Sequence, residues 1–196
     1  MKIESNSNIN FNAKLIQNTQ VKKRLFLNHY RDKTASFIKI DLNSNKDRIA
    51  MEKLSDDWWV LLTSNIVEWA EYISQLTFNS KVNLFAVTKQ KADFDNIKIK
   101  DILSIGIVSE PQEIIKDKGI TLEILQANPK YINDKKTNRY PAIKNSGKAL
   151  IDCLKESFKT KFEVYASSNA IPFYEKNDFV RVAPKSNTMI WENKNN

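Results

Sequence analysis

The sequence predicts one mixed α/β domain, a central sheet of about seven strands flanked by about four helices. Two observations support this fold class. Apolar residues alternate along several short runs, as in half-buried strands, and recur every three or four residues along others, as in amphipathic helices. The chain has 196 residues, 41% of them hydrophobic, with no internal repeat and no low-complexity linker. Such a chain is long enough to bury a core of its own as a single domain.

The first half of the chain predicts strands followed by two helices. Residues 1–12 are polar and Asn-rich, and we expect them to form a loose end. The alternation of Phe11, Ala13 and Leu15 indicates a short strand, and the run from Phe37 to Leu42 is a stronger strand pattern. The elements expected here are strands at 11–17 and 37–42 and helices at about 46–58 and 60–76.

The second half opens with three consecutive apolar runs, which predict an antiparallel meander. Gly106, inside the second run, indicates a bend, a bulge or a close backbone approach. Beyond the meander the pattern becomes helix, strand, short helix and a final pair of strands. The elements expected here are strands at 82–87, 102–108 and 119–128, a helix from 147, a strand at 162–166, a short helix carrying residues 173 and 174, and strands at 179–182 and 188–191.

The charge of the chain favours anionic partners. Lys and Arg number 31 against 23 Asp and Glu, which gives a formal net charge of +8. A basic protein attracts nucleic acid, phosphorylated cofactors and acidic surfaces. The enrichment in Lys, Asn and Ile is also what an AT-rich genome produces without selection for binding. The basic cluster 22–24 and the loop 130–139 therefore have two readings, a nucleic-acid contact or a solvated face.

The residues available for metal binding and disulfides are few. The single Cys153 forms no internal disulfide, which favours a reducing, cytoplasmic location, and it falls on an apolar helix face where core packing is the expected role. His29 is the only histidine, so we expect no metal site. No segment has the length of a membrane span, and the polar N-terminus lacks the apolar part of an export signal.

Residues 140–154 combine the features of an anion-binding turn. Asn145 and Ser146 are good helix-capping residues, and Gly147 lets a ligand approach the backbone without a Cβ in the way. An amphipathic helix follows directly. Because the first N–H groups of a helix have no acceptor within it, this turn is suited to hold phosphate.

This segment resembles the phosphate turn of the GNAT superfamily, the acetyl-CoA-dependent N-acetyltransferases. The family pattern is Gln or Arg, two residues, Gly, one residue, then Gly or Ala at the start of a helix. Two registers fit it. In one, Lys144, Gly147 and Ala149 take the three positions. In the other, which keeps the apolar register of the helix, Ala142, Asn145 and Gly147 do. Asn tolerates positive φ better than most residues, so it can replace the first glycine.

The segment Ala-Ile-Pro-Phe-Tyr-Glu-Lys-Asn-Asp-Phe, residues 170–179, is similar to a second GNAT motif. Asp178 stands where the family has Gly. This motif is more specific than the turn and lies at the expected distance after it. The resemblance covers roughly residues 36–192. It implies an N-terminal extension at 1–35, partly ordered, and a GNAT acetyltransferase domain at 36–196.

The resemblance implies a splayed sheet whose fourth and fifth strands part to admit the pantetheine arm of acetyl-CoA. The backbone of Leu125, Gln126 and Ala127 would pair with that arm as an added strand would, and the pyrophosphate would lie over the turn. Asn169 or Ser167, before the last helix, would contact CoA or serve only as a helix cap. The cofactor-binding residues implied are Leu125, Gln126, Ala127, Lys144, Asn145, Ser146, Gly147, Lys148, Ala149 and Asn169.

The resemblance also implies transfer of the acetyl group to a primary amine in a ternary complex, with no covalent enzyme intermediate. Tyr174 matches the family's proton donor to the departing thiolate, or else it is only the packed face of a short helix. Glu123 lies where some members place a general base, among apolar neighbours, or else alternation turns it to solvent.

The acceptor is not indicated by the sequence. The positive charge favours an acidic macromolecule such as charged tRNA, and the resemblance fits a monomer or a homodimer. The alternative to an enzyme is a degenerate, non-catalytic GNAT protein that binds CoA, protein or nucleic acid. The atypical turn, with Asn145 and Ala142 where the family prefers Gly and Gln or Arg, keeps that alternative open.

Overall fold

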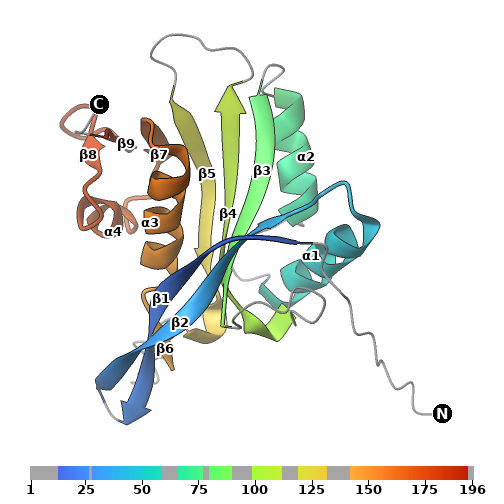
Figure 1. Ribbon diagram of the computed structural model, residues 1–196. Coiled ribbons are helices and arrows are strands. Elements are labelled where there is room, and N and C mark those ends of the chain that lie inside the picture. The colour runs from blue at the N-terminus through green and yellow to red at the C-terminus, as the bar shows by residue number, and fades with distance from the viewer. Residues whose placement is uncertain are drawn as a thin grey trace.

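The computed structural model describes residues 13–26, 28–58, 66–76, 80–89, 99–111, 119–131 and 142–193. They form a mixed sheet with helices on both faces (Figure 1). The strands are β1 (Lys14–Phe26), β2 (His29–Ile40), β3 (Ser80–Thr88), β4 (Ile102–Pro111), β5 (Ile120–Ala127), β6 (Ile143–Lys144), β7 (Phe162–Tyr165), β8 (Val180–Arg181) and β9 (Thr188–Trp191). The helices are α1 (Asn45–Trp58), α2 (Ile66–Leu76), α3 (Ser146–Phe158) and α4 (Ile171–Glu175).

The described strands form one sheet of nine in the order β6-β1-β2-β3-β4-β5-β7-β9-β8. The segment from β1 to β5 is antiparallel throughout, so the predicted meander of β3, β4 and β5 is confirmed. β5 and β7 are the one parallel pair recorded in this sheet. The mixed α/β fold class is therefore confirmed; β1 overlaps the short strand expected at 11–17, and β6 is an additional strand.

The two faces of the sheet bury separate cores. Helix α3 covers one face, where its Leu150 and Leu154 pack against Phe37, Phe85 and Phe162. Helices α1 and α2 cover the other face; the buried side chains of α1 include Met51 and Trp58. This division follows from strand geometry, since successive residues of β2, β3 and β4 point to opposite faces. The residues of the second core that lie on strands β2, β3 and β4 are Ile38, Ile40, Leu84, Ala86, Ile102, Ile105 and Ile107.

Gly106 allows α3 to approach the sheet closely. A Cβ on Gly106 would lie 2.9 Å from Leu150 Cδ2 of α3 and 3.3 Å from the Ile124 carbonyl oxygen. The sequence indicated a bend, a bulge or a close backbone approach at Gly106, and the structure shows the close approach. The helix can thus sit deep enough to place its first turn beside the end of β5.

The N-terminal strands are longer than their apolar patterns predict. β1 begins at Lys14 and runs to Phe26, and β2 begins at His29 instead of Phe37. The segment that we assigned to an N-terminal extension thus contributes β1 and part of β2 to the sheet from residue 14 onward. The added length is polar and basic, and backbone hydrogen bonds of the hairpin hold it. The predicted elements at residues 11–12 and 60–65 lie outside the described residues.

Helix α3 is preceded by the short strand β6, which the sequence did not predict. Two residues are too few for an alternating pattern, and β6 exists because it pairs with Lys22 and Lys23 in the middle of β1. Of the helices that the structure describes, none has the length and apolar character needed to cross a membrane.

Candidate functional site

Strands β5 and β7 pair over a short distance and then part. Ile120, Thr121 and Leu122 pair with Phe162, Glu163 and Val164, and no later pair is recorded between these strands. β5 continues to Ala127, whereas β7 ends at Tyr165. The last residues of β5 therefore present one edge without a strand partner from β7, and such an edge can pair with an extended ligand.

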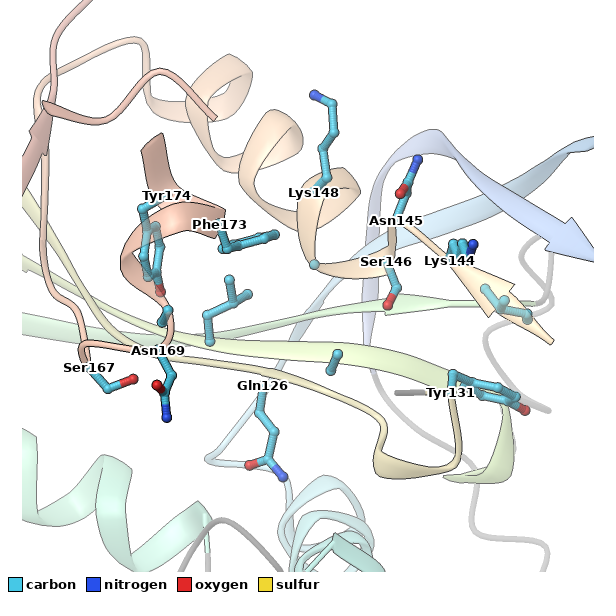
Figure 2. Close-up of a pocket in the computed structure, with 15 residues that line it drawn as sticks. Gln126, Tyr131, Lys144, Asn145, Ser146, Lys148, Ser167, Asn169, Phe173 and Tyr174 are labelled. Carbon is cyan, nitrogen blue, oxygen red and sulfur yellow. The ribbon is translucent and has the colours of Figure 1, made fainter. Parts of the chain in front are cut away.

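A cavity of about 700 Å³ lies at this gap. It is bounded by the end of β5, the start of α3, the loop after β7 and helix α4, as Figure 2 shows. Four segments far apart in the sequence thus meet around one space. The residues that line it are Leu125, Gln126, Ala127, Tyr131, Ile143, Lys144, Asn145, Ser146, Gly147, Lys148, Ser167, Asn169, Ala170, Phe173 and Tyr174.

The turn before α3 has a left-handed residue at its head. Asn145 has φ 66° and ψ 15°, a conformation that glycine and asparagine tolerate best. This backbone suits the position of the first glycine in the register that aligns Asn145 with it. The Ala149 N–H donates to the Asn145 carbonyl at 2.8 Å, which closes the first helical turn. The N–H groups before it have no acceptor within the helix and face the cavity end.

Two serines hold this turn against the sheet. The Ser104 hydroxyl of β4 donates to the Ser146 carbonyl at 2.9 Å, and the Ser146 hydroxyl donates to the Leu103 carbonyl at 3.2 Å. Ser104 and Ser146 are both buried. Because each bond joins the turn to the backbone or side chain of β4, the position of the helix N-terminus is fixed before any ligand arrives.

Gly147 leaves open the space between the turn and α4. A Cβ at this position would lie 3.4 Å from Phe173 Cζ and 4.0 Å from Leu125 Cδ2, and both residues line the cavity. Gly147 itself does not have a positive φ. The absence of a side chain at Gly147 keeps this space open, because a larger residue here would extend into the cavity.

The two lysines of the turn are held away from its centre. Lys144 Nζ lies 4.2 Å from the centre of the Tyr30 ring and 3.3 Å from Asn28 Oδ1, both on the β1–β2 hairpin. Lys148 Nζ pairs with Asp152 one turn along α3, at 2.7 Å, and points away from the cavity (Figure 2). They add positive potential at the mouth, while the backbone supplies the direct contacts to an anion.

Tyr174 is the most buried titratable group of the cavity. Its side chain is 5% exposed and packs against Phe173 and Phe179 at ring distances of 5.2 and 5.4 Å. Figure 2 shows its hydroxyl directed toward Asn169 at the far end of the cavity from Lys144. Burial raises the pKa of Tyr174 to about 12, because an ionised phenol would lose its hydration there. The group therefore stays protonated throughout the neutral range.

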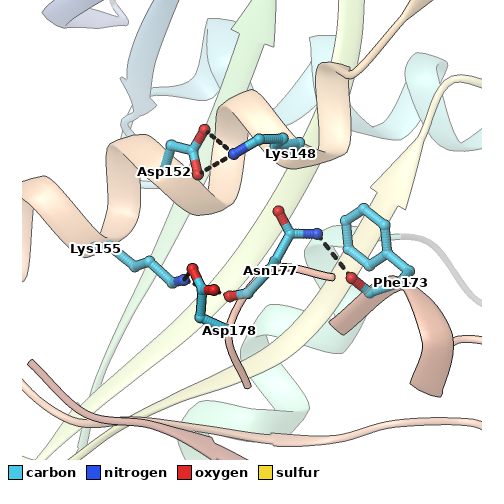
Figure 3. A network of polar contacts seen from close by, with 6 residues as sticks. All are labelled: Lys148, Asp152, Lys155, Phe173, Asn177 and Asp178. Atoms are coloured by element: carbon cyan, nitrogen blue, oxygen red, sulfur yellow. Dashed lines mark hydrogen bonds and ion pairs between the residues drawn. The ribbon is translucent and has the colours of Figure 1, made fainter. Parts of the chain in front are cut away.

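Helix α4 is fastened to α3 by a lysine. Lys155 Nζ donates to the Asn177 carbonyl and lies 3.8 Å from Asp178 Oδ2 (Figure 3). It also lies over the ring of Phe179, 5.1 Å from its centre. Burial lowers the pKa of Lys155, and the Asp178 carboxylate opposes that shift. Asp178 has φ 64°, which explains why the resembling motif has glycine here. This anchoring sets the position of Tyr174.

Two of the residues proposed from the sequence, Glu123 and Ala149, do not line the cavity. Glu123 does not line the cavity: the pairing of β4 with β5 skips it as a bulge, and its carboxylate accepts from Ser109. Ala149 is buried and does not line the cavity, and its N–H donates to the Asn145 carbonyl within the helix. Asn169 lines the cavity together with Ser167. The other proposed residues, from Leu125 to Tyr174, gather around the cavity.

Gln126 lies on the opposite side of β5 from α3, as Figure 2 shows. Its Nε2 is 3.4 Å from the Trp58 carbonyl oxygen at the end of α1, and its buried Oε1 has no hydrogen-bond partner among the described residues. Sequence reasoning assigned only its backbone a role. Tyr131, Ile143, Ala170 and Phe173 were also not predicted as lining residues, since only the fold brings them to the gap.

Solved structures provide the comparison that decides the fold. The chain is similar to a structure of AtaTR bound with acetyl-CoA, with a TM-score of 0.52 and 11% identity over 82% of this chain and 94% of the other. The chain has the GNAT fold. A structure of a Tyr-to-Phe variant of the AtaT toxin, bound to the C-terminus of the antitoxin AtaR, matches with a TM-score of 0.50 and 10% identity over 82% and 92% of the two chains.

The GNAT fold is thus established from shape and not from sequence. No protein-family description matches the chain, and no curated protein matches it. At 10–11% identity, the two structural matches establish the arrangement of strands and helices and leave the chemistry to be argued from the site itself.

Proposed function

We propose that this protein is an N-acetyltransferase that transfers an acetyl group from acetyl-CoA to a primary amine. The observation that carries the proposal is the cavity between β5 and β7, which has a helix N-terminus at one end and the protonated phenol of Tyr174 at the other. The helix N-terminus can bind the phosphorylated tail of a long thioester, and the open edge of β5 can pair with its extended arm. The buried proton donor at the other end can then serve the thioester itself.

The cosubstrate would lie along the open edge of β5. The backbone of residues 125–127 would pair with the amide groups of the pantetheine arm. The pyrophosphate would accept hydrogen bonds from the N–H groups of Ser146, Gly147 and Lys148, in the turn headed by Asn145. Lys144 and Asn169 border the two ends of this path. A cosubstrate bound in this orientation would have its thioester near Tyr174.

The chemistry is direct transfer between two bound substrates. The amine nitrogen attacks the thioester carbonyl carbon, the carbon–sulfur bond breaks, and the proton lost by nitrogen is balanced by the proton gained by sulfur. Tyr174 would donate to the sulfur as negative charge develops on it. Its raised pKa keeps that donor protonated while the amine is deprotonated. The amine would approach from the side of Gln126, since α3 occupies the other face.

The rival function is a GNAT-fold protein that binds CoA without catalysis. It is favoured by the position of Glu123, whose carboxylate accepts from Ser109 and lies outside the cavity. No Asp or Glu lines the cavity among the described residues. An enzyme with this site would rely on the amine's own ionisation or on water as base. The acceptor class that we propose is a primary amine, carried by a small molecule or by an acidic macromolecule such as charged tRNA.

Both proposed functions require the protein to bind CoA, and calorimetry with acetyl-CoA tests that requirement. We expect wild-type protein to bind acetyl-CoA and Gly147→Trp to lose that binding, because the new side chain would fill the space beside Phe173 and Leu125. Tyr165→Trp, at a side chain 75% exposed, is the control for the added indole. Absence of binding by wild-type protein would refute the proposal.

Tyr174→Phe tests the enzyme against the binding module. The substitution keeps the ring contacts with Phe173 and Phe179 and removes only the donor. We expect acetyl-CoA affinity within about threefold of wild type and a turnover, on a primary-amine panel, lowered about 10²-fold, the lower range for loss of a general acid. An unchanged turnover would exclude Tyr174 from the mechanism. CoA binding without turnover on any amine would favour the module.

A further inference from the structure

The β1–β2 hairpin carries a surface that the acetyl-CoA site does not use. We call residues 21–26 and 28–34 the basic arm. Figure 1 shows it extending beyond the body of the sheet on the side where β6 lies. The arm contains five cations, Lys22, Lys23, Arg24, Arg31 and Lys33, against one carboxylate, Asp32. Much of the net charge of +8 is therefore concentrated in one short ribbon.

Strand register divides these charges between the two faces of the arm. Lys23 is paired with Arg31, and the neighbouring position Lys33 is paired with Val21, so the three cations share one face. All three are exposed, and none has an ion pair recorded within the described residues. On the other face, Lys22 pairs with Asp32 at 2.7 Å. Like charges this close repel each other, so a polyanion bound there would relieve that repulsion.

The tip of the arm exposes aromatic and aliphatic surface to water. Phe26 is 60% exposed and Leu25 is 55% exposed. The Phe26 ring is stacked on His29 with centroids 4.6 Å apart and an interplanar angle of 19°. The hairpin itself preorganises this pair, and the exposed face of such a pair can stack on a nucleic-acid base. An acidic protein surface would use the charges and leave the stacked rings without a partner.

The arm is continuous with the acetyl-CoA cavity. Lys144, which lines the cavity, is paired with Lys22 through β6, and its Nζ lies over Tyr30 of the arm. Lys144 and Tyr30 lie on the face of Lys22, opposite to Lys23, Arg31 and Lys33, so the arm adjoins the cavity through its other face. The inference does not depend on acetyl transfer, since the arm and its charges are complete without acetyl-CoA.

We propose that the basic arm binds single-stranded nucleic acid. Phosphates would contact the face formed by Lys23, Arg31 and Lys33, and an unpaired base would stack at Phe26 and His29. A charged groove or ribbon with exposed rings is the general basis of strand binding without sequence preference. RNA and DNA share the phosphate and base chemistry that the arm would recognise.

The test measures fluorescence anisotropy of labelled 20-nucleotide oligouridine and oligothymidine with the full chain, without acetyl-CoA. Three phosphate contacts predict a Kd that weakens about 20-fold between 50 and 200 mM salt. Lys23→Gln/Arg31→Gln/Lys33→Gln should remove most of this dependence. The matched control, Lys46→Gln/Lys176→Gln/Lys185→Gln, removes three exposed charges elsewhere and should retain it. Equal losses in both triple variants would show a general charge effect and overturn the proposal.

Substitution at the tip tests stacking separately from charge. Phe26→Ser should weaken oligonucleotide binding about fivefold or more and leave the salt dependence unchanged. The ring is exposed, so the fold should tolerate the change. Lack of saturable binding by wild-type protein at 50 mM salt would overturn the proposal, whatever calorimetry shows for acetyl-CoA. Equal affinity for duplex and single-stranded oligonucleotide, together with no effect of Phe26→Ser, would also overturn the proposal. Tighter binding to polyglutamate or to anionic vesicles than to the oligonucleotides would overturn it too.

Discussion

Tyr174→Phe makes a quantitative prediction about stability at alkaline pH. The raised pKa of about 12 in the folded protein exceeds the ordinary value of 10.0 by about two units. Below pH 10 the phenol is protonated in both states and contributes no pH dependence. As pH rises from 10 to 12, the unfolded chain releases this proton and the folded chain does not, so stability falls. Two units correspond to about 2.7 kcal/mol in full, and about 1.4 kcal/mol of that is lost by pH 11.

The assay is urea unfolding of wild-type protein and Tyr174→Phe at pH 8 and pH 11. The substitution leaves every other titratable group in place, so the contributions of those groups cancel in the difference. We expect the variant to gain about 1.4 kcal/mol relative to wild type between the two pH values. Tyr165→Phe, at a phenol exposed in both states, should show no such gain. A difference independent of pH for Tyr174→Phe would refute the burial argument for its protonation.

Two further predictions test the turn and the close approach of α3. Asn145→Val should cost about 1–2 kcal/mol of unfolding free energy because the residue is left-handed at φ 66°, whereas Asn145→Gly should cost little; equal stabilities by urea denaturation would contradict this. Gly106→Ala should cost about 1–3 kcal/mol, because the new Cβ would lie 2.9 Å from Leu150 Cδ2. Adding Leu150→Ala should recover part of that cost in a double-mutant cycle, and strict additivity would count against the contact.

Sequence patterns predicted those parts of the site whose conformation depends only on neighbouring residues in the chain. A capping residue followed by an amphipathic run predicts a helix N-terminus, so Asn145, Ser146 and Gly147 could be assigned to one before the fold was seen. Asn145 is the N-cap, although its side chain makes no capping hydrogen bond. The left-handed backbone of Asn145 and Asp178 also agrees with residues that tolerate it. Glu123 could not be placed in the same way. Strict alternation puts it on one face or the other, whereas a bulge in the pairing of β4 with β5 turns it toward Ser109.

The extent of the basic arm also required the structure. Apolar alternation detects strands that bury one face, and residues 22–33 bury little, so the pattern ended β1 early and began β2 late. Their pairing is held by backbone hydrogen bonds that carry no side-chain signature. For the same reason the two residues of β6 had no signal of their own and exist only through β1.

The sequence by itself determined the mixed α/β class, the meander, the helix that follows the turn, and the resemblance to GNAT acetyltransferases. These depend on periodicity and on residue types at fixed short spacings. The resemblance implied two parting strands. Only the tertiary structure decided that they are β5 and β7 and part after Leu122, that Tyr174 is buried at one end of the gap, and that the basic arm adjoins its other end. Those features arise from pairings between segments distant in the chain, which no local spacing records.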